Sequence, residues 1–267
     1  MSVIHRICEE QRALVHRRRR EVSLEALREA PRYHGPTRSL AGALRAAPVA
    51  VIAEHKRASP SQGSYGVTLS PEAIARGYAE AGACAISVLT EENHFGGSLA
   101  HLRAIRACVD VPLLRKDFIV DAYQLHEAKA HGADAVLLIA AALTLDEAHE
   151  LRTVAHHLSL EVLLEVHEAA ELDYLDIGPD VVGVNNRNLR TLNIDLRTSE
   201  TLAASLPGEL VRITESGIGD AAAAARLLRF GYDGMLVGTQ FMRTPKPAVA
   251  LSTFFTDVRE RLAAASC

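Results

Sequence analysis

The stretch VIAEHKRASPSQG, residues 51–63, places an acid and a base two positions apart at the end of an apolar run. Side chains two residues apart in an extended chain point to the same side, so Glu54 and Lys56 are expected to face the same space. An acid and a base that share a pocket suit paired proton transfer to and from a bound molecule. The stretch therefore predicts acid–base chemistry at the end of a buried strand.

Other apolar runs end in the same way. Lys116 and Phe118 share a face after one run, Glu165 ends another, and Asn185 and Arg187 share a face after a third. Because hydrogen-bonding or ionisable side chains recur at the same end of each run, we expect them to line one polar pocket. By contrast, the side chains that alternate away from these positions or lie further into loops are expected to reach solvent outside the site; these are Arg57, Arg115, Asp117 and Arg190.

The elements that must position these residues are short β-prone runs, each apolar with little polar alternation. Such runs are typical of strands buried on both faces, and therefore of a parallel sheet covered by helices. The segments between them are rich in Ala, Leu, Glu and Arg, which favour helix. The runs lie at residues 48–54, 83–90, 111–117, 133–141, 160–166, 181–186, 211–216 and 233–239.

Eight such units predict an α/β fold, a (β/α)8 TIM barrel, whose usual length is about 250 residues. The alternative is a doubly wound open sheet, but no GxGxxG follows the first run. Residues 1–46 are expected to form a helical extension, with helices over HRICEEQRALVHRRRR (5–20) and SLEALREA (23–30). The extension is expected to pack onto the barrel of residues 47–267, so that the 267 residues make a single domain.

Two runs end in small, glycine-containing turns, Glu215-Ser216-Gly217 and Gly238-Thr239. In a barrel these would follow the seventh and eighth strands, where phosphate is commonly bound by backbone N–H groups and a helix N-terminus. Glycine lets the backbone approach such an anion closely. A plain tight turn would explain either sequence alone, but the two together favour a phosphate site.

The composition narrows the class of protein. Lys plus Arg is 29 and Asp plus Glu is 33, a formal net charge of −4 that gives no reason to expect nucleic acid. Four scattered cysteines without a CxxC pair, and histidines without HExxH spacing, indicate neither a disulfide framework nor a metal site. The chain contains no apolar stretch long enough for a membrane span and begins without the apolar core of a secretion signal, so we expect a cytoplasmic protein.

Taken together, the motifs resemble the indole-3-glycerol phosphate synthase family. In order, from about Val49 to Arg243, they are VIAEHKRASPSQG, ISVLTEENHFGGS, PLLRKDFIVDAYQLHEAKAHGADAVLLI, LLEVH, VGVNNRNLRTL and ITESGI…GMLVGTQFMR. The resemblance implies a carboxy-lyase of tryptophan biosynthesis, with an extra helix over the barrel mouth. The reaction implied is closure of the indole ring of 1-(2-carboxyphenylamino)-1-deoxyribulose 5-phosphate with loss of carbon dioxide and water. No metal or organic cofactor is implied.

The resemblance also implies roles for a catalytic group. Lys116 would be the general acid at the substrate carbonyl, and Glu165 the general base or acid–base partner of the dehydration. Lys56 would pair with the substrate carboxylate and is a second candidate acid, so which lysine delivers the first proton stays open. Glu54 would tune the lysines and take part in proton transfer. Asn185 would donate a hydrogen bond near the carboxylate that leaves.

A second group implied by the resemblance would bind the substrate. The phosphate would be held by Ser59, Ser216, Gly217, Gly238 and Thr239. The anthranilate ring would lie against Phe95, Phe118 and Leu236. Arg187 and Glu215 would support the site. The expected partner is thus a phosphorylated small molecule, with no nucleic acid and no membrane. A monomer or weak homo-oligomer is expected, and association with other tryptophan-pathway enzymes is left open.

Two other functions stay open at this point. Another phosphosugar barrel enzyme, such as a phosphoribosylanthranilate isomerase, would share the phosphate turns but lacks the pair of lysines in EHKRASPS and RKDF. A barrel that binds its ligand without turning it over would not be expected to keep every catalytic position. The loop RASPSQGSYG, residues 57–66, is hypothesised to be a mobile lid. His55, where the family usually has a hydrophobic residue, is expected to point towards the helix layer.

Overall fold

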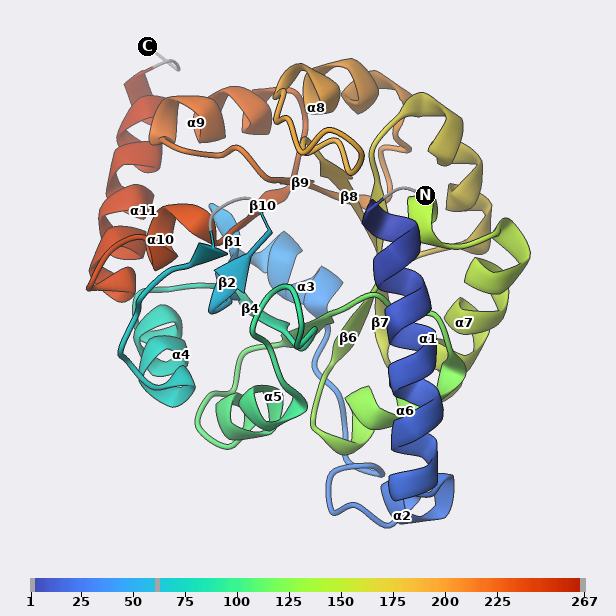
Figure 1. Cartoon of the computed structure of the whole chain (residues 1–267). Helices are drawn as coiled ribbons and strands as arrows, with labels where there is room; N and C mark the ends of the chain where they lie inside the picture. Colours follow the sequence, from blue (N-terminus) through green and yellow to red (C-terminus); the bar gives the residue numbers. More distant parts are fainter. Residues whose placement is uncertain (1–2, 61–62, 265–267) are drawn as a thin grey trace.

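The computed structural model describes residues 3–60 and 63–264 and contains a closed barrel of eight parallel strands, ringed by helices (Figure 1). Around the barrel the strands follow the order β1, β10, β9, β8, β7, β6, β5, β4. Each lies within one of the predicted runs, except that β1 extends one residue beyond its run to His55, and the predicted TIM-barrel fold is confirmed. The strands are β1 (Ala50–His55), β4 (Ala85–Leu89), β5 (Leu113–Lys116), β6 (Ala135–Ile139), β7 (Glu161–Val166), β8 (Val181–Asn185), β9 (Val211–Glu215) and β10 (Gly234–Val237).

Helices lie on the outside of the barrel; most connect successive strands, and the last two, α10 and α11, follow β10. They are α4 (Pro71–Glu80), α5 (Leu99–Arg106), α6 (Ala122–Ala130), α7 (Leu145–His157), α8 (Arg197–Leu202), α9 (Ala221–Arg229), α10 (Thr239–Met242) and α11 (Pro247–Ala264), with 3-10 helices η1 (Ala140–Ala142), η2 (Ala169–Ile177) and η3 (Ala203–Ser205). Asp121 and Thr144 begin α6 and α7 with capping boxes, which satisfy orphan N–H groups of the first turn. Gly82, Gly132 and Gly231, which follow the ends of α4, α6 and α9, all adopt the positive φ angles that commonly end a helix.

The extension contains the two predicted helices and one that was not predicted. α1 (Val3–Glu21) crosses the carboxyl-terminal end of the barrel, and α2 (Leu24–Arg28) follows it (Figure 1). The additional helix, α3 (Leu40–Ala46), packs its buried Leu40 and Leu44 against the core inside the barrel. Such a short run contains too few helical turns to show periodicity in the sequence. The division of the chain at residue 46 stays a prediction.

The alternation of each strand divides the core into two parts. On β1, Ala50 and Ile52 belong to the cluster inside the barrel, whereas Val51 and Ala53 pack outwards against the helices. Both faces are apolar over most of each strand, which is why the runs show little alternation in the sequence. A separate antiparallel pair, β2 (Ala58–Ser59) with β3 (Gly63–Ser64), lies in the loop after β1.

The expectation that Arg115 and Asp117 reach solvent is wrong. Arg115 is completely buried and pairs with Asp117 at 3.0 Å and with Glu127 of α6 at 3.2 Å. Thr90 also donates to Asp117, at 2.6 Å. This network fixes β5 to the helix layer, and a strand sequence does not reveal it because the partners come from other elements. Arg190 is exposed, as expected. Among the described residues no helix is long and apolar enough to cross a membrane.

His55 points outwards, as expected, and is fully buried in the helix layer. Its ring lies edge-to-face against His101 of α5, with ring centroids 5.4 Å apart. Neither ring nitrogen of His55 has a hydrogen-bond partner in the part of the chain that the structure describes. Burial lowers the pKa of His55 to about 3, and His101 and Arg57 contribute to the lowering.

Acidification should therefore destabilise the fold through His55. Between the ordinary pKa of 6.5 and about 3, the unfolded chain binds a proton that the folded chain excludes, so stability falls as pH falls. We expect His55→Leu to remove this loss. Between pH 7.5 and pH 5 the free energy of unfolding of the variant should fall by about 2 kcal/mol less than that of the wild type. Urea unfolding at the two pH values measures it. His149→Leu, an exposed site on α7, is the control. Equal acid sensitivity of His55→Leu and wild type would contradict the assignment.

Candidate active site

The site forms where the inward face of each strand changes from apolar to ionisable. On β1, Ile52 packs inside the barrel, and the next residue on that face is Glu54. The step recurs on alternate strands around the barrel, as Leu114–Lys116 on β5, Leu163–Glu165 on β7 and Ile213–Glu215 on β9. Because all strands run the same way, their ionisable ends meet at one mouth, as a parallel barrel requires.

A cavity of about 360 Å³ occupies this mouth, and every side chain predicted for the site lines it. The structure therefore brings together residues from seven strands or the loops that follow them. They are Glu54, Lys56, Ser59, Phe95, Lys116, Phe118, Glu165, Asn185, Arg187, Glu215, Ser216, Gly217, Leu236, Gly238 and Thr239. No set of three or more His, Cys, Asp or Glu in the described ranges could hold a metal ion.

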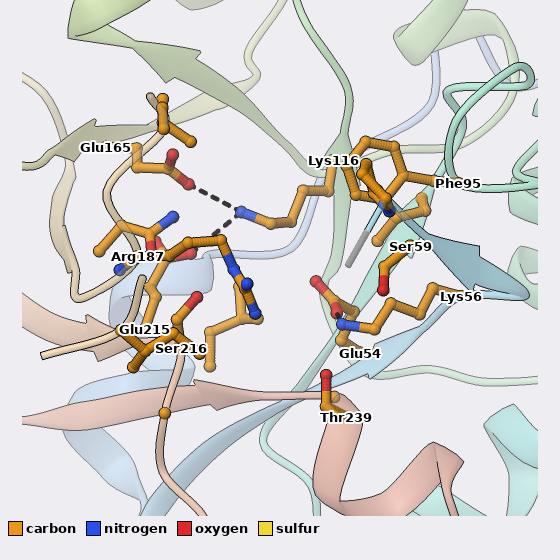
Figure 2. Close-up of a pocket in the computed structure, with 18 of the residues that line it drawn as sticks. Glu54, Lys56, Ser59, Phe95, Lys116, Glu165, Arg187, Glu215, Ser216 and Thr239 are labelled. Carbon is orange, nitrogen blue, oxygen red and sulfur yellow. Dashed lines mark hydrogen bonds and ion pairs between the residues drawn. The ribbon is translucent and has the colours of Figure 1, made fainter. Parts of the chain in front are cut away.

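The Lys116 ammonium lies at the centre of the charges. Its Nζ donates to Glu165 Oε2 at 2.9 Å and to Glu215 Oε2 at 3.0 Å, the two dashed contacts drawn in Figure 2. Burial by itself would lower the pKa of Lys116, but the carboxylates of Glu165, Glu215 and Glu54 outweigh it and raise the pKa above its usual range. Lys116 is therefore a cation that holds its proton until a strongly basic oxygen forms nearby.

The two carboxylates that share Lys116 differ in protonation. Burial raises the pKa of Glu215 to about 7; Lys116 opposes the rise and Glu165 adds to it. Glu165 is equally buried, but Lys116 and His167 outweigh that burial and hold its pKa well below the usual range. The pair thus offers one permanent carboxylate and one group that takes up or releases a proton near neutral pH.

Glu54 and Lys56 form a direct ion pair at the other side of the pocket, beneath Ser59 (Figure 2). A residue that was not predicted, Tyr65, braces this pair. Its ring centroid lies 5.7 Å from Lys56 Nζ, and its hydroxyl lies 3.1 Å from the hydroxyl oxygens of both Ser59 and Thr239. Tyr65 thereby joins the loop after β1 to the end of β10.

The turn after β9 has an unusual backbone that a buried amide supports. Ser216 and Gly217 both adopt positive φ angles, of 63° and 78°. The side chain of Asn186 donates to the carbonyl oxygens of Glu215 (2.9 Å) and Ser216 (3.1 Å). Non-glycine residues adopt such angles only where their surroundings impose them, so Asn186 helps to hold the turn open towards the pocket.

Gly238, after β10, meets a different demand, because a Cβ there would overlap the side chain of Glu54. It precedes the short helix α10, which Thr239 begins. The glycine is therefore required for close approach between neighbouring strands and not for a left-handed backbone.

An apolar wall faces these polar groups. The rings of Phe95 and Phe118 lie with centroids 6.4 Å apart, and Ile4 and Ile7 of α1 also line the cavity. Glu91 holds the loop that carries Phe95 by accepting from three successive main-chain N–H groups, the last being that of Phe95. Ile4 and Ile7 were not predicted as site residues, because their i, i+3 spacing marks an apolar helix face but not what that face covers.

The predicted lid loop is only partly described, because residues 61–62 lie outside the described ranges. The residues flanking them pair as a hairpin, with Ala58 opposite Ser64 and Ser59 opposite Gly63. Arg57 donates to the carbonyl oxygens of Val67 and Leu69 and so anchors the end of the loop. Mobility of this lid stays a prediction.

Ionisable groups gathered at the carboxyl-terminal mouth of a barrel of eight parallel strands, beside two small turns on adjacent strands, define a TIM-barrel enzyme. A family model described as indole-3-glycerol phosphate synthase matches residues 4–254. The chain is 45% identical over 258 residues to an indole-3-glycerol phosphate synthase of Bacteroides thetaiotaomicron, covering 97% of this chain and 99% of that one. It is 46% identical to that of Salinibacter ruber over 255 residues, or 94% of each chain.

The chain belongs to the indole-3-glycerol phosphate synthase family, carboxy-lyases of tryptophan biosynthesis. Solved structures agree on the fold alone. Thiamine phosphate pyrophosphorylase from Pyrococcus furiosus superposes with a TM-score of 0.61 at 17% identity, covering 84% of this chain and 100% of that one. The alpha subunit of tryptophan synthase from Legionella pneumophila superposes with a TM-score of 0.58 at 14% identity, covering 81% of this chain and 93% of that one.

The position of Glu215 can be tested without altering any ionisable group. A Cβ on Gly183 of β8 would overlap Glu215 Oε1 and lie 3.2 Å from Leu163 Cδ1. We expect Gly183→Ala to displace the Glu215 carboxylate from Lys116 and lower kcat at least tenfold, at a stability cost of about 1–3 kcal/mol. Steady-state kinetics and thermal unfolding measure the two effects.

The control is Gly208→Ala, because nothing lies within 4 Å of a Cβ there. A Gly183→Ala enzyme with wild-type kcat would show that the placement of Glu215 is unimportant to turnover.

Proposed function

We propose that the pocket converts 1-(2-carboxyphenylamino)-1-deoxyribulose 5-phosphate to indole-3-glycerol phosphate with Lys116 as the general acid of ring closure. The observation that carries this proposal is the buried ammonium of Lys116, held between Glu165 and Glu215 in the cavity. An acid in that position has its proton fixed in direction and is shielded from bulk water. Both features favour protonation of a substrate oxygen in the transition state.

The substrate has three chemically distinct parts that match three parts of the pocket. We infer that its phosphate binds the turns at Ser216–Gly217 and Gly238–Thr239, which line the cavity and can offer backbone N–H groups to an anion. Its aromatic ring fits beside Phe95 and Phe118, whose spacing leaves an apolar wall. The carbonyl carbon then falls between the two ends, within the range of Lys116.

Ring closure joins the ring carbon that bears the carboxylate to the carbonyl carbon. As this bond forms, the carbonyl electron pair moves onto oxygen, and Lys116 supplies the proton that the oxygen needs. Cleavage of the bond to the carboxylate then returns an electron pair to the ring and releases carbon dioxide. Lys56 is placed to pair with that carboxylate before it leaves, with Asn185 as a hydrogen-bond partner.

Dehydration requires a proton for the departing hydroxyl and a base for the proton on the adjacent ring carbon. Glu165, held ionised, is the proposed base. Glu215, whose pKa is about 7, lies across the same ammonium and is suited to pass a proton to or from Lys116 between steps. Glu54 forms a second ion pair with Lys56, so that two lysine–carboxylate units, one at Lys56 and one at Lys116, face the substrate from different strands.

The proposal is tested by incubating the purified protein with the carboxyphenylamino-deoxyribulose phosphate and following indole fluorescence, with EDTA added to remove adventitious metal. A rise in fluorescence is expected. No rise from folded protein that still binds a substrate analogue would indicate a binding barrel or a different phosphosugar substrate.

The role of Lys116 predicts a specific kinetic defect. Lys116→Ala should lower kcat by about 10²–10⁴-fold because it removes the proton donor. Binding of a phosphorylated analogue should be largely retained, since the phosphate turns lie on β9 and β10 and Lys116 on β5. Steady-state kinetics and calorimetric titration measure the two effects.

Lys246→Ala is the matched control, because Lys246 is exposed before α11 and away from the cavity lining. Near-normal turnover by Lys116→Ala would rule out the proposed acid.

A further inference from the structure

A histidine that the family-based roles leave unused lies directly behind the proposed base. His167 follows β7 two residues after Glu165 and is largely buried, with 9% of its side chain exposed. Its Nε2 lies 3.1 Å from Glu165 Oε1. The other oxygen of that carboxylate, Oε2, accepts from Lys116. Glu165 is therefore held on both oxygens, by an ammonium on the pocket side and an imidazole behind.

The imidazole is itself held in place by a second carboxylate. His167 Nδ1 lies 3.3 Å from Glu171 Oε2, and the main-chain N–H of His167 donates to the same oxygen at 2.6 Å. Glu171 belongs to η2, the 3-10 helix between β7 and β8. Two contacts from one carboxylate to the ring and backbone of His167 leave the ring little freedom to turn away from Glu165. His167 is not among the described residues that line the cavity.

We propose that His167, anchored by Glu171, is a positioning residue that aims the Glu165 carboxylate at Lys116 and keeps it ionised through the reaction. The inference rests on the proposed function, in which Glu165 is a base. It adds a chain of alternating charge, Glu171–His167–Glu165–Lys116–Glu215, that runs from the helix layer to the centre of the cavity.

The charges of the chain favour this reading. Burial opposes protonation of His167, but Glu165 and Glu171 outweigh it and raise its pKa to about 10, so the ring is an imidazolium at neutral pH. Without the His167 cation, Glu165 and Glu215 would have to share the positive charge of the Lys116 ammonium between them. A carboxylate that loses a neighbouring cation takes up a proton at higher pH. Loss of His167 should therefore move the acid limb of the pH–activity profile to higher pH.

The central experiment is the pH dependence of kcat for His167→Gln. Glutamine keeps a polar donor near Glu165 but carries no charge. We expect kcat at pH 7 to fall about tenfold and the acid limb to rise by about one pH unit. KM should change less than about twofold, because the phosphate turns and the apolar wall are untouched. His167→Lys, which restores a cation, should return the limb most of the way to its wild-type position.

A matched control is available outside the cavity. His156 of α7 also pairs with a carboxylate, Asp180, at 2.8 Å, and neither residue lines the pocket. His156→Gln should leave the pH profile unchanged. Should His167→Gln fail to fold, Glu171→Gln tests the same chain, since it keeps the imidazole but weakens its anchor; a smaller shift in the same direction is expected.

Two outcomes would overturn the inference. One is a wild-type kcat and pH profile for His167→Gln, and the other is a loss of thermal stability with the profile unmoved, as for a purely structural residue. Glu165→Gln, assayed in parallel, separates the proposals. If Glu165→Gln is inactive and His167→Gln is normal, only the inference about His167 fails. If Glu165→Gln is fully active, the proposed base is wrong, and the role of His167 falls with it.

Discussion

The buried ammonium of Lys116 is the interaction on which the rest of the site depends. Two carboxylates, Glu165 and Glu215, lie within 3.0 Å of its Nζ inside the barrel, where neither would be tolerated as an isolated charge. Their arrangement separates their acidities: the pKa of Glu215 rises to about 7 while that of Glu165 falls below its usual range. Burial, the shared ammonium of Lys116 and the second cation at His167 therefore make two identical side chains chemically different.

The barrel supplies the geometry that this arrangement needs. Glu165 of β7 lies in register with Gly183 of β8, and Asn185 of β8 with Glu215 of β9, so the polar ends of three successive strands meet at the mouth. Gly183 has no side chain, and the Glu215 carboxylate occupies the space that a Cβ would fill. A small residue on one strand is thus a condition for an ionisable residue on the next.

The N-terminal extension completes both ends of the barrel. At the amino-terminal end, α3 packs Leu40 and Leu44 against the inner core, so that the strands are covered where they begin. At the mouth, α1 contributes Ile4 and Ile7 to the cavity wall and is tied to the loop after β4 by His94 and Glu10, at 2.7 Å. The extension therefore shapes the space in which the substrate ring is proposed to lie.

Much of this molecule follows from the sequence alone. Apolar runs at regular intervals predict the strands, and the period of two along each run identifies Glu54, Lys116 and Glu165 as inward-facing ends. These are local properties, because alternation depends only on the backbone of one strand. The family followed from motifs of the same local kind. The short helix α3 escaped because seven residues carry too little periodicity.

Only the tertiary structure decided which of these groups touch, and with what consequence. The contact of Lys116 with both Glu165 and Glu215 joins residues 49 and 99 positions apart in the chain. The buried partners Asn186, His167 and Arg115 are likewise defined by neighbours on other elements. Acidity depends on burial and on distances between charges, and both are set when the barrel closes. For that reason the candidate acids and bases could be predicted from the sequence, whereas their protonation states depend on the tertiary structure.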